Sequence, residues 1–137
     1  MAAIEYLLCL LILLSPLPSF AESANVTPSA RVTGTYSSLS YNTDGGDLNG
    51  MEIRFVLTRK GIKGVVQFAE GGAGDLALVD VMVTGTHIQF EMPAGSDTEG
   101  TFEGTVSSKG LEGTFSYKGG AKEHLTLPRT GSYWDKH

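Results

Sequence analysis

The sequence predicts an all-β protein, an antiparallel up-and-down meander of eight strands that closes into a small barrel. Apolar and polar residues alternate with a period of two along most of the chain from residue 31 onward. The connecting segments are about two to seven residues long, too short for the helices that parallel strands need between them. Glycine is abundant, with 18 residues against five prolines, and it suits tight turns and bent strands.

The first 21 residues are expected to be a signal peptide. The run from Tyr6 to Leu14 is almost wholly apolar, and Ser19 and Ala21 are small residues at the spacing that signal peptidase prefers. The run is too short to cross a hydrocarbon core of ~30 Å as a helix. Glu5 lies in an amino-terminal stretch without lysine or arginine, which is atypical of a leader. An uncleaved anchor is therefore the alternative.

The remaining chain divides into a linker, one domain and a tail. Residues 22–30 are small and polar, residues 31–129 form the predicted barrel domain, and residues 130–137 form a carboxyl-terminal tail. We expect an exported protein, periplasmic or extracellular. The only cysteine is Cys9, inside the predicted leader, so the mature domain would depend on core burial instead of disulfides.

Eight stretches carry the strand pattern, and polar or glycine-rich turn segments separate them. The longest glycine-rich segment, Glu70–Gly74, is expected to be a flexible loop. The fourth stretch differs from the others, because Leu76–Val83 is apolar on both faces except at Asp80. The predicted strands are residues 32–37, 51–58, 63–68, 76–84, 87–92, 101–106, 111–117 and 124–128.

Closure of the meander follows from its edges and its glycines. An open meander leaves two unpaired edge strands, and pairing the first strand with the last removes both. Four glycines fall on the predicted inner face, where they permit sharp bending and close approach of strands: Gly34, Gly64, Gly104 and Gly113. A two-sheet β-sandwich is the alternative architecture.

The predicted inner face is large and rich in aromatic residues. Its members are Tyr36, Ile53, Phe55, Leu57, Val66, Phe68, Ile88, Phe90, Met92, Phe102, Val106, Phe115, Tyr117, Leu125 and Leu127. An eight-stranded barrel is just wide enough to be filled by side chains or to hold one small ligand. We expect a small hydrophobic ligand to enter at one open end, with a filled core as the alternative. The expected lining is Tyr36, Phe55, Phe68, Phe90, Phe102, Phe115 and Tyr117.

The doubly apolar stretch Leu76–Val83 suggests a second function. An exposed apolar stripe of this length is usually covered by another surface. A homodimer contact, a protein partner or the tail around Tyr133 and Trp134 would cover it. The competing hypothesis is therefore a structural or interaction module.

Charge and motifs argue against several other classes. The net charge is −5 and no basic stripe exists, which disfavours nucleic acid and anionic lipid surfaces. No nucleophile elbow or phosphate-binding loop is present, so we expect no enzyme. His87 and His124 lie on strands that are not neighbours in a meander, so we expect no metal site and no cofactor.

One resemblance adds to this interpretation. Gly34-Thr35-Tyr36, the meander and the repeat Gly-Leu-Glu-Gly-Thr-Phe at 110–115 resemble the lipocalin-like (calycin-like) barrels of small secreted bacterial proteins. The stretch 34–127 is similar to a domain that occurs alone or ahead of exported α/β-hydrolase domains. Lipocalins begin with Gly-x-Trp, closed off by a basic residue from the last strand. The resemblance implies that Tyr36 stands at the tryptophan position, that Arg129 is the basic partner, and that an accessory role beside a hydrolase is a further possibility.

Overall fold

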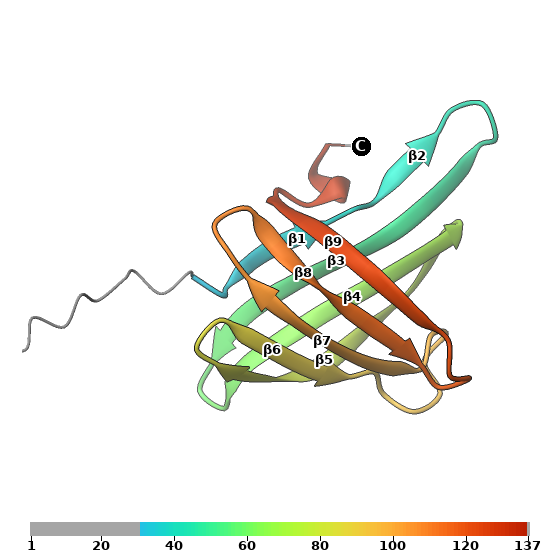
Figure 1. Ribbon diagram of the computed structural model, residues 1–137. Coiled ribbons are helices and arrows are strands. Elements are labelled where there is room, and N and C mark those ends of the chain that lie inside the picture. The colour runs from blue at the N-terminus through green and yellow to red at the C-terminus, as the bar shows by residue number, and fades with distance from the viewer. Residues whose placement is uncertain (1–30, 137) are drawn as a thin grey trace, which may run out of the picture.

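The computed structural model describes residues 31–136 as a nine-stranded antiparallel sheet that closes on itself (Figure 1). The predicted signal peptide and linker lie outside the described residues. The elements are β1 (Gly34–Ser37), β2 (Ser40–Asn42), β3 (Asp47–Thr58), β4 (Gly61–Gly71), β5 (Ala73–Thr84), β6 (His87–Glu91), β7 (Gly100–Val106), β8 (Gly110–Tyr117), β9 (Lys122–Thr130) and the 3-10 helix η1 (Tyr133–Asp135). Within residues 31–136, no helix has the length and apolar character that crossing a bilayer requires.

The barrel closes through β1. Strands β3 to β9 each pair with the next in the chain, and β1 pairs with both β3 and β9. These eight strands therefore have no open edge along the seam where the meander begins and ends, which confirms the predicted barrel. In the register of this seam, Tyr36 lies opposite Ile53 on β3 and opposite Arg129 on β9.

A cation–π contact between Arg129 and Tyr36 stabilises the closure of the barrel. The Arg129 guanidinium lies 4.7 Å from the centre of the Tyr36 ring, as the lipocalin resemblance implied. Its Nη1 donates to the Thr33 carbonyl at 2.9 Å, and its Nη2 donates to the Tyr36 hydroxyl. The Tyr36 hydroxyl in turn donates to the Val32 carbonyl at 2.7 Å. Burial raises the pKa of Tyr36, and Arg129 offsets part of that rise.

Strand β2 was not predicted, and it lies outside the barrel. Its three residues are all exposed and show no alternation, so the sequence carries no strand signal there. It becomes a strand because it pairs with the start of β3, with Tyr41 opposite Leu48. Figure 1 shows this hairpin extending beyond the barrel wall.

Two further expectations from the sequence are wrong. The predicted loop Glu70–Gly74 is mostly strand, because β4 continues to Gly71 and β5 begins at Ala73. Gly71 allows this abrupt reversal with a φ of +80°, a conformation that favours glycine. Leu57, assigned to the inner face, is 74% exposed. It lies one residue before the end of β3, close to the β3–β4 turn and away from the core.

The core lies inside the barrel and is dominated by the predicted inner face. Fifteen buried residues form it: Tyr36, Met51, Ile53, Phe55, Val66, Ala77, Val79, Ile88, Phe90, Met92, Phe102, Val106, Leu111, Phe115 and Leu127. The inward glycines make room for rings instead of leaving voids. A Cβ on Gly64 would lie 3.3 Å from the Phe55 ring, and one on Gly104 would lie 2.7 Å from Phe102 Cζ. The glycines therefore allow close packing as well as curvature.

We expect Gly113→Ala to destabilise the protein by about 1–3 kcal/mol, the usual cost of overpacking. A Cβ at this position would lie 2.3 Å from the Glu103 carbonyl oxygen and 2.6 Å from Phe102 Cζ. The midpoint of urea unfolding measures the effect. Gly119→Ala is the matched control, because nothing lies within 4 Å of a Cβ there. Equal midpoints for the two variants would contradict the close packing.

Candidate functional site

The seven aromatic residues expected to line a ligand site all belong to the barrel interior. Five of them are at most 3% exposed: Tyr36, Phe55, Phe90, Phe102 and Phe115. Phe68 and Tyr117 are partly buried and pack against this core. The rings contact one another in two series, with centroid separations between 4.8 and 6.5 Å: Tyr36–Phe55–Phe90–Phe102 and Phe68–Phe115–Tyr117. Ring packing thus occupies much of the space that a ligand in the middle of the barrel would need.

One end of the barrel is open as a pocket of about 800 Å3. Residues from the starts of β3, β5 and β9 and from the ends of β4 and β8 line it. Phe68 and Tyr117 are the aromatic members of this lining, and Glu70, Asp97 and Glu123 are its charged members. The sequence predicted the two aromatic residues but not the three carboxylates. Of the seven aromatic residues expected to line a ligand site, these two line this opening, which we call the end pocket.

Tyr117 is the titratable group most affected by this environment. Burial, a hydrogen bond to the Glu123 carboxylate and the nearby negative charges of Glu123 and Glu70 raise its pKa to about 12. Each of these effects disfavours the phenolate. Tyr117 is therefore a hydrogen-bond donor at neutral pH and is unsuited to act as a general base there.

A second opening lies in the barrel wall between β5 and β6. Strand β5 pairs with β4 over residues 73–80, but with β6 only over Val81–Thr84. Within residues 31–136, the first part of β5 therefore has no strand partner on the side of β6. The connection after β6 crosses part of this space, where the Asp75 amide donates to Asp97 Oδ2 at 2.9 Å. We call this unpaired region the β5–β6 gap.

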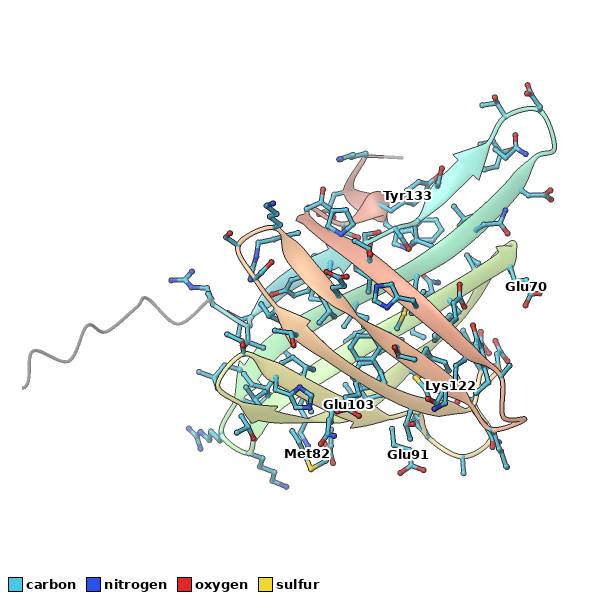
Figure 2. All side chains as sticks on the ribbon, in the orientation of Figure 1. Glu70, Met82, Glu91, Glu103, Lys122 and Tyr133 are labelled. Atoms are coloured by element: carbon cyan, nitrogen blue, oxygen red, sulfur yellow. The ribbon has the colours of Figure 1, made fainter. Side chains whose placement is uncertain are left out.

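A groove of about 740 Å3 lies along the β5–β6 gap. The core residues Val79, Phe90 and Phe102 belong to its lining, together with Leu78 and Met82 from the outer face of β5. The full lining is Leu78, Val79, Asp80, Met82, Gln89, Phe90, Glu91, Pro93, Thr101, Phe102 and Glu103. In Figure 2, Met82, Glu91 and Glu103 lie along the same lower side of the barrel. We call this opening the wall groove.

The outer face of β5 is apolar and exposed. Leu76, Leu78 and Met82 are 68%, 65% and 66% exposed, while Ala77 and Val79 between them are buried. Asp80 shares the outer face and forms an ion pair with Lys63. Successive side chains of a strand point to opposite faces, so the apolar residues of β5 divide between an inner face in the core and an outer face exposed to water.

The carboxyl-terminal tail covers a neighbouring part of the barrel. The buried Glu52 carboxylate accepts a hydrogen bond from Ser132 Oγ at 2.5 Å and another from the Tyr133 amide at 2.8 Å. Trp134 Nε1 donates to Gln67 Oε1 at 2.8 Å. The tail therefore packs over β3 and β4, and Leu76 stays largely exposed beside it. Glu52 alternates like an ordinary outward residue, so its burial carried no sequence signal.

The two histidines within residues 31–136 each pair with a different glutamate on the surface. His87 Nε2 lies 3.3 Å from Glu103 on β7, and His124 Nε2 lies 3.1 Å from Glu112 on β8. In the part of the chain that the structure describes, no group of three or more His, Cys, Asp or Glu side chains is arranged to hold a metal ion.

The fold and these openings define an eight-stranded antiparallel barrel, consistent with a lipocalin-like fold, with one polar end pocket and one apolar wall groove. No protein-family model, curated protein or solved structure matches the chain.

The pKa of Tyr117 gives a test of the end pocket. Since the folded pKa is about 12 and the ordinary value is 10.0, the folded state retains its proton longer than the unfolded state. The Tyr117 contribution to stability is therefore complete below pH 10 and is lost as the pH rises toward 12. Ultraviolet difference titration of wild type against Tyr117→Phe measures the pKa. We expect Glu123→Gln to lower the pKa toward 10, whereas Glu112→Gln, whose side chain pairs with His124, leaves it unchanged.

Proposed function

We propose that this protein is an exported, non-enzymatic, lipocalin-like barrel that binds a small hydrophobic molecule in the wall groove. The observation that carries this proposal is an apolar groove of about 740 Å3 beside two exposed apolar side chains, Leu78 and Met82. Small-molecule sites usually measure about 300–1,000 Å3 and have mainly apolar linings. The leader pattern of residues 1–21 supports export, and the Tyr36–Arg129 contact supports the lipocalin-like assignment.

The wall groove suits an apolar ligand better than the centre of the barrel does. The buried aromatic residues already contact one another, so a central ligand would have to displace their rings. A ligand in the wall groove would instead cover Leu78 and Met82, whose side chains face water. Covering apolar surface stabilises a complex by about 25 cal/mol per Å2. Phe90 and Phe102, both expected from the sequence to line the site, belong to the groove lining.

The test is titration with N-phenyl-1-naphthylamine, an uncharged dye whose fluorescence rises in apolar surroundings. We expect saturable binding, and we expect Met82→Gln to weaken it about fivefold because the variant removes apolar contact at the groove. Leu57→Gln is the matched control, since Leu57 is 74% exposed against 66% for Met82 and does not line the groove. Absence of a saturable signal, or equal loss in both variants, would contradict the proposal.

A second candidate function is protein association through the outer face of β5. Leu76, Leu78 and Met82 place three large exposed apolar side chains on this face. A second copy or a protein partner would cover them, and a secreted hydrolase is the partner that the resemblance implies. Val81, which lies within the apolar stretch Leu76–Val83, is partly buried and packs against the core. A charge at Val81 would therefore unfold the barrel and would not report on association.

Leu76 separates the two candidate functions, because it lies on the outer face of β5 but outside the wall groove. If association between copies is the function, wild type sediments as a dimer and Leu76→Glu as a monomer, with unchanged circular dichroism. Leu57→Glu controls for added charge and remains dimeric. If wild type is monomeric over the concentration range of the experiment, self-association is contradicted.

A further inference from the structure

The charged residues that line the wall groove all have the same sign. Asp80, Glu91 and Glu103 contribute carboxylates, and the lining contains no lysine, arginine or histidine. These carboxylates come from three strands or their immediate ends, so the fold brings them together around the apolar part of the groove. The chain as a whole is also acidic, with a net charge of −5.

The surroundings of each carboxylate decide how much negative charge the groove presents. Lys63 pairs with Asp80 and compensates its charge. The His87 ring lies 3.3 Å from Glu103 and does not line the groove. Glu91 has neither an ion pair nor a side-chain hydrogen bond within residues 31–136, and it is exposed. Glu91 is therefore the carboxylate best placed to meet a charged ligand.

The charged residues that line the other openings near the β5–β6 gap are also all negative. The pocket of about 310 Å3 on the far side of Pro93 includes Asp75 and Asp97 and no basic residue. The end pocket has only carboxylates as charged groups: Glu70, Asp97 and Glu123. A ligand that approaches the barrel from this side meets negative potential, which attracts cations and repels anions.

We propose that the ligand of the wall groove is an apolar molecule that carries a positive charge, such as a long-chain amine or quaternary ammonium compound. Its apolar part covers Leu78 and Met82, and its cation lies beside Glu91. A fatty-acid anion of the same length is disfavoured by the same carboxylates. This inference rests on the proposed function, because it specifies the ligand class of the same groove.

The experiment compares three ligands with the same ten-carbon chain. Decyltrimethylammonium, decanoate and the uncharged decyl maltoside are titrated calorimetrically into the protein at pH 8, below their micelle concentrations. Two unit charges about 4 Å apart in water change affinity by about fivefold. We therefore expect the cation to bind at least about tenfold more tightly than the anion. The preference should shrink between 0.05 and 1 M salt, because the Debye length falls to about 3 Å at 1 M.

Variants locate the preference at the groove. We expect Glu91→Gln to reduce the cation-to-anion ratio at least about tenfold and Glu91→Lys to reverse it, with binding of decyl maltoside unchanged. Glu112→Gln is the matched control, since Glu112 is an exposed strand carboxylate outside the groove.

The outcomes separate this inference from the function on which it rests. Binding of the neutral ligand without a preference for the cation, or with one that Glu91→Gln leaves intact, overturns the inference and leaves the proposed function standing. Failure of all three ligands to bind overturns both.

Discussion

Closure of the barrel at β1 is the constraint on which the other features depend. This strand is only four residues long, yet it supplies the pairing that joins β3 to β9. Its stability relies on side chains as well as on backbone hydrogen bonds. The Tyr36 ring is completely buried, and Arg129 covers it while bonding to backbone carbonyls of the segment before β1. Without the pairing of β1, the two long strands β3 and β9 would present unpaired edges.

The interior of a closed barrel of this size has room either for packed side chains or for one small ligand. Aromatic side chains from six strands meet there, and glycines on neighbouring strands let their rings approach the backbone. The result is a packed interior instead of a deep cup. The larger openings are therefore found at the barrel's margins, where strand pairing is incomplete: at one end, and in the wall where β5 separates from β6. The change of strand partner along β5 therefore creates the opening in the barrel wall.

Charged groups around the two openings and the carboxyl-terminal tail determine the character of the outer surface. Carboxylates line both openings, while Lys63 pairs with Asp80 and His87 pairs with Glu103 at the wall groove. The tail places Ser132 and Trp134 over β3 and β4 and buries Glu52, but leaves the apolar face of β5 open to water. The exposed part of that face is continuous with the wall groove through Leu78 and Met82.

The sequence by itself determined the all-β class, the antiparallel order and most of the core, because strand periodicity of two and short connections leave few other arrangements. It also identified Tyr36 and Arg129 as partners, through the resemblance. It did not reveal β2, whose polar residues pair only because β3 extends past the barrel, or the exposure of Leu57 near a turn. Only the tertiary structure decided that β5 changes partners at Val81 and that Asp80, Glu91 and Glu103 meet around one groove. Those features depend on which residues of distant segments become neighbours, and local alternation contains no information about that.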